Sequence, residues 1–231
     1  MKAKSFFAAV SALLVASAPA SPFLFDFDPN LTDIAAGAVG VTDLSSPVNG
    51  VFGSDTITLT ASTGNTLANS RDRGANTGPA SDITRDFIQW GTASPITITI
   101  SGLVADQEYS FKVWSGDLAG GQIKTTDHTI AGASGGGTVQ HTSVSLAEEN
   151  AATGTSLHQV DLPNVVSTAS GTLTYTIDFV SGGGSAATLN GFELAVAVPD
   201  TTNPTLIATD PADDATDAPA SASLEVTFDE D

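Results

Sequence analysis

The clearest candidate for chemistry is a tryptophan at the end of an alternating stretch, SGLVADQEYSFKVWSGD (residues 101–117). Successive side chains of a strand point to opposite faces, so the Tyr, Phe and Val of this stretch form the core face and Trp114 lies off it. Asp117 follows shortly after. An indole off the core face is either a ligand platform or is covered by a neighbouring loop, and the sequence leaves both possibilities open.

A second group, RDFIQW, places Arg85 and Asp86 just before Trp90. Guanidinium and carboxylate groups can bind the hydroxyls of a ligand that rests on an indole. The same two residues can instead form a structural ion pair. The candidate binding residues around Trp114 are therefore Asp117, Arg85, Asp86 and Trp90.

Three carboxylates are candidate ligands for a structural calcium ion, which takes several oxygen ligands. Asp26 and Asp28 alternate onto one face of the first predicted strand, and Glu193 lies on the last. These carboxylates can share one Ca²⁺ ion if the first and last strands run close together. Otherwise they are solvated charges at the edge of a sheet.

Residue patterns typical of enzymes are sparse. No two histidines have the spacing of an HExxH metal site, and no G-x-S-x-G elbow occurs at a strand-to-helix turn. The histidines are His128, His141 and His158. The distance between paired acids, on which glycoside hydrolysis depends, is a property of the fold. We expect no catalysis within this chain.

The elements that position these residues are short strands. Runs with period-two alternation, rich in Thr and Val, are separated by Gly, Asn, Asp and Ser. The runs are SPFLFDFD, DTITLTAS, ITRDFIQW, PITITISGL, EYSFKVWSG, HTIAGA, TVQHTSVSL, HQVDL, GTLTYTIDFVS and ATLNGFELAVAV. They predict an all-β fold, an antiparallel β-sandwich or jelly roll. LAEENAATG is at most a weak helical turn, and AGASGGGT and SGGGS are expected to be hairpin connections.

The N-terminus has the pattern of a secretory signal peptide. Lys2 and Lys4 precede the apolar run FFAAVSALLVA, and Ala18-Pro19-Ala20 supplies small residues for cleavage after Ala20. We therefore expect a secreted or cell-surface protein, with residues 1–20 as signal peptide. The absence of cysteine suits a bacterial envelope or extracellular protein rather than a disulfide scaffold.

The charge balance is strongly acidic. The chain has 7 basic and 26 acidic residues, and loss of Lys2 and Lys4 leaves a net charge of 5 − 26 = −21. Such a chain repels nucleic acid and anionic lipid, so neither is an expected partner. The excess charge fits a saline or calcium-containing habitat, and it equally fits ordinary solubility.

After residue 199 the composition changes to acids and prolines. Residues 200–231 resemble the start of a bacterial Ig-like domain of the SbsA type, with Asp214 where that pattern prefers Gly. The matching residues are Asn203-Pro204, Pro211-Ala212-Asp213, Ala215-Thr216-Asp217, Pro219 and Val226-Thr227-Phe228. An Ig-like sandwich needs about 100 residues, so this segment is expected to be incomplete.

Residues 21–199 resemble the galactose-binding-like jelly rolls found beside catalytic domains in secreted polysaccharide-degrading proteins. The resemblance rests on Phe25-Asp26-Phe27-Asp28, on the stretch 101–117, and on Leu189-Asn190-Gly191-Phe192-Glu193-Leu194. It implies a non-catalytic module that binds a polysaccharide or cell-surface glycan within a larger polypeptide, and in many members a structural calcium. A structural or adhesion module without a ligand is the main alternative. A polysaccharide-degrading enzyme with catalysis outside this chain is the third.

Overall fold

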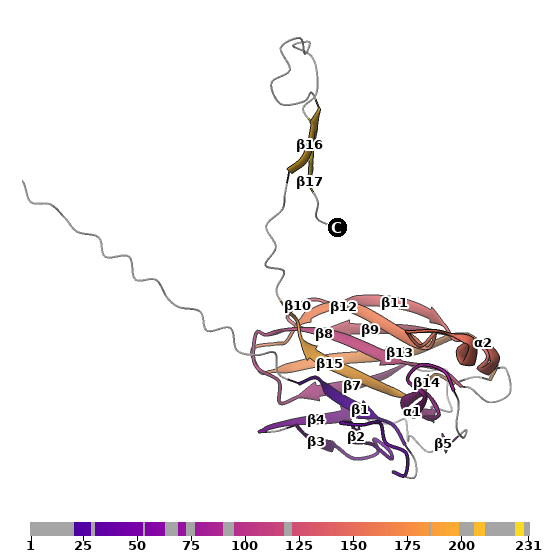
Figure 1. Cartoon of the computed structure of the whole chain (residues 1–231). Coiled ribbons are helices and arrows are strands. Elements are labelled where there is room, and N and C mark those ends of the chain that lie inside the picture. Colours follow the sequence, from indigo (N-terminus) through magenta and orange to yellow (C-terminus); the bar gives the residue numbers. More distant parts are fainter. Residues whose placement is uncertain are drawn as a thin grey trace, which may run out of the picture. The chain divides into compact units, whose positions relative to one another are not determined.

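The alternating runs form strands in a computed structural model of the chain, drawn in Figure 1. The structure describes residues 21–28, 31–52, 54–62, 69–72, 77–89, 95–117, 122–184, 186–198, 206–210 and 225–228, with backbone alone at 69–72, 206–210 and 225–228. The expected signal peptide, residues 1–20, lies outside these ranges. The chain divides into two units, Met1–Ala197 and Val198–Asp231.

Six strands form one sheet of the first unit, here called sheet A, in the order β10-β12-β8-β15-β1-β2. Its first and last long strands in sequence lie side by side, because β1 pairs antiparallel with β15. The strands are β1 (Phe23–Asp26), β2 (Val39–Gly40), β8 (Glu108–Trp114), β10 (Ser134–Gly135), β12 (Gln159–Val166) and β15 (Gly191–Val196).

Six further strands form sheet B, in the order β11-β9-β13-β7-β4-β3, with antiparallel pairing throughout. The strands are β3 (Val48–Phe52), β4 (Asp55–Ala61), β7 (Ile96–Ser101), β9 (Lys124–Ala131), β11 (Gly137–Thr142) and β13 (Thr172–Gly182). The two sheets make an antiparallel β-sandwich, which confirms the predicted all-β fold class.

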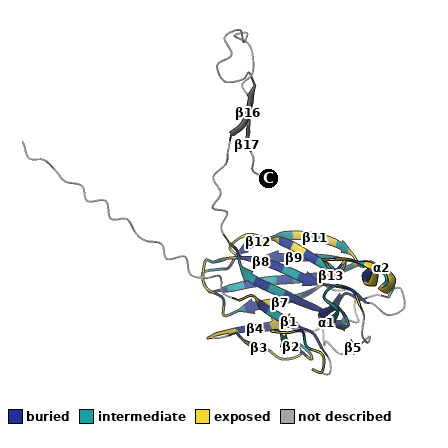
Figure 2. Cartoon of the chain, viewed as in Figure 1, coloured by how far each residue is buried: buried dark blue, intermediate teal, exposed yellow. Residues whose placement is uncertain are grey.

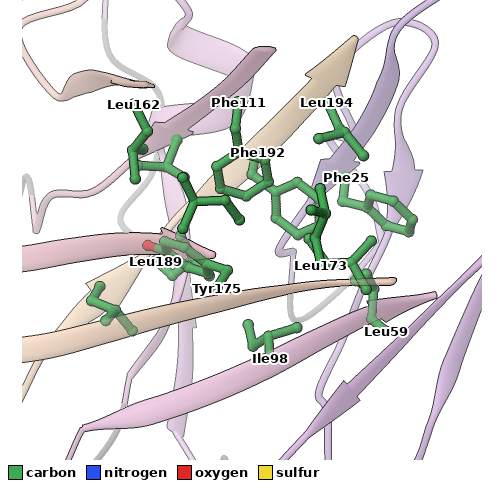
Figure 3. Close-up of a cluster of buried hydrophobic side chains, with 14 of the residues drawn as sticks. Phe25, Leu59, Ile98, Phe111, Leu162, Leu173, Tyr175, Leu189, Phe192 and Leu194 are labelled. Carbon is green, nitrogen blue, oxygen red and sulfur yellow. The ribbon is translucent and has the colours of Figure 1, made fainter. Parts of the chain in front are cut away.

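The core lies between the sheets and follows directly from the alternation of each strand. Phe111 and Phe192 of sheet A meet Tyr175 and Leu59 of sheet B there (Figure 3), and all four side chains are buried. The Phe111 ring lies 5.2 Å from Phe192 and 5.3 Å from Tyr175, centroid to centroid. Each fully buried side chain of this size stabilises the fold by about 1.5–3 kcal/mol. Figure 2 shows exposed residues mainly at outer faces and connections.

A small third sheet and a short helix lie beside the sandwich. The sheet has the order β14-β6-β5, with β5 (Asn69–Asp72), β6 (Asp86–Gln89) and β14 (Thr188–Leu189). The helix α1 (Ser81–Thr84) directly precedes β6. The prediction of one strand over ITRDFIQW is therefore wrong at its start, because Ile83 and Thr84 belong to the helix.

The segment judged a weak helical turn contains a second helix, α2 (Leu146–Ala151). Its start is a capping box: Ser145 Oγ accepts from the Glu148 backbone N–H at 3.3 Å, and Glu148 Oε2 accepts from the Ser145 N–H at 2.8 Å. These bonds satisfy two of the backbone donors that a helix start leaves open. The sequence SLAE carries this signal, which outweighs the poor helix formers that follow.

The glycine-rich run AGASGGGT joins β9 to β11 and contains the short strand β10. Gly135 and Gly136 have φ values of 68° and 72°, in the left-handed region that favours glycine. The prediction that this loop connects strands through positive-φ glycines is confirmed.

The second unit contains an antiparallel pair, β16 (Leu206–Asp210) and β17 (Glu225–Phe228). The SbsA-type Ig-like assignment of residues 200–231 stays a prediction. In the part of the chain that the structure describes, no helix has the length and apolar character needed to cross a membrane.

Candidate functional site

Strand β8 carries the tryptophan from which the site prediction started. Tyr109, Phe111 and Val113 point into the main core with at most 2% of their surface exposed. Trp114 belongs to a different buried cluster. The division of β8 into a core face and an outer face is therefore confirmed.

Trp114 is nevertheless only 5% exposed, so the ring is covered and presents no open platform. Ala35 and Ile83 of the neighbouring loop and helix lie over it. The sequence left open whether Trp114 is a ligand platform or is covered by a neighbouring segment. In the structure it is covered. Gly191 of β15 lies opposite Trp114 in the strand register. Its lack of a side chain allows Ile83 to pack closely here, because a Cβ at Gly191 would lie only 2.9 Å from Ile83 Cγ2.

The polar edge of Trp114 has no partner among the described residues. Its Nε1–H is buried and makes no hydrogen bond. A buried donor left unsatisfied costs about 1–3 kcal/mol. The Lys112 ammonium lies 5.9 Å from the centre of the indole ring and 3.3 Å from Glu193 Oε1. The indole is thus held in place by packing rather than by hydrogen bonding.

Arg85 and Asp86 form the ion pair that the sequence left as an alternative to sugar contact. The Arg85 Nε atom lies 3.4 Å from Asp86 Oδ2, and Arg85 Nη2 lies 3.0 Å from Asp33 Oδ2. The Asp86 side chain is 1% exposed, which leaves no surface for a ligand. Trp90, the remaining aromatic candidate, lies outside the described residues.

Asp117 forms an ion pair inside the fold. Its Oδ2 atom lies 3.8 Å from the Lys124 ammonium of β9, and both side chains are 2% exposed. In this structure Trp114, Asp86 and Asp117 are buried, so these residues form no open surface, and sugar binding by Trp114, Asp117, Arg85 and Asp86 stays a prediction. Each charged member takes part in an ion pair: Arg85 with Asp86, and Asp117 with Lys124.

Asp26 and Asp28 are buried, so the alternative of solvated edge charges is wrong for both. Asp28 Oδ2 accepts from the Thr32 and Asp33 backbone N–H groups at 2.8 and 3.1 Å. Asp26 Oδ2 accepts from the Ala35 N–H at 2.8 Å, whereas Asp26 Oδ1 has no hydrogen-bond partner. Burial raises the pKa of Asp26 to about 7, and the nearby Asp28 carboxylate adds to the rise.

Glu193 does not join the two aspartates in the predicted calcium site. It lies opposite Leu24 in the β1–β15 register and bonds to Lys112. Within the described ranges, no three acidic or histidine side chains lie close enough together to hold a metal ion. Asp26, Asp28 and Glu193 thus do not form one cluster in the described part of the chain, and the structural calcium stays a prediction.

The structure gathers all three histidines, which sequence spacing did not suggest. His128 of β9 is fully buried, its Nδ1 lies 2.7 Å from Tyr175 Oη, and its Nε2 lies 2.8 Å from Thr126 Oγ1. The His141 ring lies 6.2 Å from that of His128. His158 is also fully buried, and neither of its ring nitrogens makes a hydrogen bond.

The outer face of sheet B is a partly exposed polar surface, here called the threonine face. Its residues alternate with the core residues of β4, β7, β9, β11 and β13 and are Thr56, Thr58, Thr60, Thr97, Thr99, Ser101, Thr125, Asp127, Thr129, Thr138, Gln140, Thr142, Thr172, Thr174, Thr176 and Asp178. The repeated Thr-x-Thr spacing of DTITLT, ITITIS and TLTYT is the sequence signal that indicates this surface.

Strand register arranges these hydroxyls in rows across the sheet. One row contains Thr138, Thr129, Thr176 and Thr97 from four neighbouring strands. Thr129 and Thr138 hydroxyls lie 2.8 Å apart, and those of Thr97 and Thr176 lie 3.1 Å apart. Each hydroxyl has one donor and two acceptor positions, so such pairs keep capacity for further hydrogen bonds.

The threonine face carries almost no charge, although the chain is strongly acidic. Its charged members are Asp127 and Asp178, which lie directly opposite each other in the β9–β13 register. Gln140 Nε2 donates to Asp127 Oδ1 at 2.9 Å. No lysine or arginine belongs to this face as defined above. The surface therefore offers hydroxyls, methyl groups and two carboxylates.

Comparison with known proteins gave no family assignment. No family model matches the chain, and no curated protein matches it. The solved structures with limited similarity include the following three, each with a TM-score below 0.5. The ANXUR2 extracellular domain from Arabidopsis thaliana has 12% identity and a TM-score of 0.38, and the match covers 76% of this chain and 49% of that chain.

The second is a ruminal GH26 endo-beta-1,4-mannanase, with 13% identity, a TM-score of 0.34, and coverage of 78% of this chain and 27% of that chain. The third is TmCBM61 in complex with beta-1,4-galactotriose, with 8% identity, a TM-score of 0.31, and coverage of 67% and 91%. This chain thus spans about half of the first structure and about a quarter of the second. The galactose-binding-like assignment stays a prediction.

Proposed function

We propose that residues 21–199 form a non-catalytic module that binds a neutral polysaccharide or cell-surface glycan on the threonine face. The observation that carries this proposal is the row arrangement of uncharged hydroxyls on an exposed sheet of a strongly acidic protein. Strands lie about 4.8 Å apart, so the five strands from β11 to β4 span about 20 Å. An extended glycan chain can lie across a surface of this width.

The chemistry of the face excludes other classes of ligand. A polyanion finds no cation there and is repelled by Asp127 and Asp178. A purely apolar partner would bury hydroxyls without hydrogen bonds, at about 1–3 kcal/mol for each unsatisfied group. A neutral sugar donates and accepts hydrogen bonds and presents C–H groups to the threonine methyls. Neutral carbohydrate is therefore the ligand class that fits best.

The test is affinity electrophoresis of the mature chain in gels that contain neutral polysaccharides. Thr99 is exposed on β7, between β13 and β4 of the face, so Thr99→Glu should weaken retention about tenfold. Ser110→Glu is the matched control, because Ser110 is exposed on β8 of the other sheet and the added charge is the same. The control should bind like the unaltered chain.

Two outcomes would contradict the proposed site. Equal retention of the Thr99→Glu variant and the unaltered chain would remove the threonine face from the interaction. Loss of binding in Trp114→Phe alone would instead assign it to the covered indole. Retention on acidic polysaccharides, stronger than on neutral ones, would contradict the proposed ligand class.

A structural or adhesion module without a ligand is the second candidate. The specific observation in its favour is the burial of Trp114 beneath Ala35 and Ile83, where the ring contributes to packing. No retention on any neutral glycan, together with a destabilised Trp114→Phe variant in urea, would favour this function. In both proposals the module lies outside the cell as part of a larger polypeptide, after cleavage following Ala20.

A further inference from the structure

Two histidines, His141 of β11 and His158 just before β12, lie near the Ser115–Gly116 turn that follows Trp114. His158 Nδ1 and Nε2 and His141 Nε2 are buried without hydrogen bonds. The Ser115 backbone favours the protonated form of both rings and so raises their pKa. Burial lowers the pKa of both His158 and His141 to about 4, and for His141 the neighbouring His158 lowers it further.

The charged and titratable groups around these rings come from several elements. Asp117 follows β8 and favours protonation of His158, but it is engaged with Lys124 of β9. His128 of β9 faces His141, and both of its nitrogens are bonded. Glu149 of α2 accepts from the Leu157 N–H at 2.8 Å. A proton added to His158 or His141 is therefore not matched by a free carboxylate in the closed structure.

The His158 ring packs against the turn that follows Trp114. It lies so close to Gly116 that no Cβ would fit between Gly116 and the ring. The Ser115 N–H donates to the His158 carbonyl at 2.9 Å. Movement or hydration of a charged His158 would therefore displace Ser115 and Gly116 directly.

Asn190 connects this turn to the cover of Trp114. Its Oδ1 accepts from the Gly116 N–H at 2.7 Å. Its Nδ2 donates to the Thr84 carbonyl at 3.1 Å and to the Asp86 carbonyl at 2.6 Å. Thr84 ends α1, the helix that places Ile83 over the indole. A continuous set of contacts thus runs from His158 through Gly116 and Asn190 to the cover.

We propose that this set of contacts is an acid-sensitive latch: protonation of His158 and His141 displaces the Ser115–Gly116 turn, weakens the Asn190 bonds to Thr84 and Asp86, and uncovers Trp114. The open state binds protons that the closed state excludes. The population of the open state therefore rises as pH falls, by up to about tenfold per pH unit for each histidine involved. The uncovered indole, with its unpaired Nε1–H, is then a latent ligand site on the outer face of sheet A.

The experiment follows Trp114 in the full mature chain with Trp90→Phe, which leaves it as the sole tryptophan. Acrylamide quenching and emission wavelength are measured from pH 7.5 to 4.5, with far-UV circular dichroism at each step. We expect quenching to rise several-fold and emission to shift to the red between pH 6.5 and 4.5, with an unchanged β-sheet signal. No glycan is present, so the result is independent of the threonine face.

Variants separate the latch from general acid sensitivity. His158→Gln combined with His141→Gln should abolish the rise in quenching. His128→Gln is the matched control and should retain the rise in quenching, because both ring nitrogens of His128 are hydrogen-bonded, to Tyr175 and Thr126. An equal rise in the double variant would overturn the proposal. So would a rise that appears only when the β-sheet signal is lost.

If the double variant does not fold, a second measurement tests the latch without histidine variants. NMR titration of the histidine Cε1–H resonances in the otherwise unaltered chain reports each ring. The latch requires His158 and His141 to titrate below about pH 6, together with shifts of the Asn190 side-chain amide. Titration of both rings near the ordinary value of about 6.5, without a response at Asn190, would overturn it.

Discussion

At the scale of single residues, burial decides what each polar group in this protein does. Arg85, Asp86, Asp117 and Lys124 are charged, but each is committed to a partner inside the fold. Removing one member of such a pair leaves the other charge buried, which costs several kcal/mol. Substitution of any of these residues should therefore lower the stability of the fold, whatever its effect on ligand binding.

Asp26 is the residue at which burial most clearly changes chemistry. Its pKa of about 7 in the folded state exceeds the unfolded value of 3.8, so its contribution to stability is fully present below pH 3.8 and is lost as pH rises toward 7. Asp26→Asn should therefore stabilise the fold at pH 8 by up to about 4 kcal/mol. At pH 4 it should have little effect.

Urea unfolding at the two pH values measures this difference. Asp55→Asn is the control, because Asp55 is an exposed aspartate of β4 and should change stability little at either pH. If Asp26→Asn lowered the unfolding free energy at pH 8, the ionised carboxylate would be a favourable part of the fold. A bound cation at Asp26 would be one cause of that result.

At the scale of elements, short local signals determine whether a segment is a helix or a strand. The run ITRDFIQW alternates like a strand, but its first residues are in α1 because Ile83 packs over Trp114 and Gly191. The segment SLAEENA forms α2 because Ser145 and Glu148 cap each other. Helix α2 in turn holds the loop before β12 through Glu149 and Leu157.

Removal of the cap should destabilise α2 locally. Ser145→Ala deletes the side-chain acceptor, and such changes cost about 0.5–2 kcal/mol. We expect faster amide hydrogen exchange in Leu146–Ala151 and a lower urea midpoint for the whole unit. Ser110→Ala on exposed β8 is the control and should leave both unchanged. Unaltered exchange in α2 would show that tertiary contacts alone hold the helix.

At the scale of the whole molecule, the three histidines make stability depend on pH. Burial lowers the folded-state pKa of His128 to about 3 and those of His141 and His158 to about 4, below the unfolded value of 6.5. Their contribution to stability is therefore fully present above pH 6.5 and is lost as pH falls toward 4. The contribution of Asp26 to stability changes in the opposite direction, because it increases as pH falls through the same range.

Because three histidines oppose one aspartate, the unfolded state takes up at most about two more protons between pH 6.5 and 4. The unfolding free energy should fall by up to about 3 kcal/mol per pH unit in this range. Urea midpoints at half-unit steps of pH measure the slope. A flat profile between pH 7 and 5 would mean that the histidines are hydrated in the folded protein.

The sequence alone determined the all-β class, the position of most long strands and the core face of β8. Period-two alternation is a local property, and it sorts Tyr109, Phe111 and Val113 from Trp114 without reference to any other element. The same local pattern predicted that the first and last strands carry charged residues on one face. It contained no information about what covers that face.

Only the tertiary structure decided which candidate residues are available to a ligand. Trp114 is covered by residues 35 and 83, which are distant in sequence. His128, His141 and His158 meet only because β9, β11 and the turn before β12 come together. The threonine rows likewise depend on the register between strands, and a shift by one residue would turn each set to the other face. Burial, register and ion pairing are products of contacts between distant segments, and for this reason the fold class was predictable and the site was not.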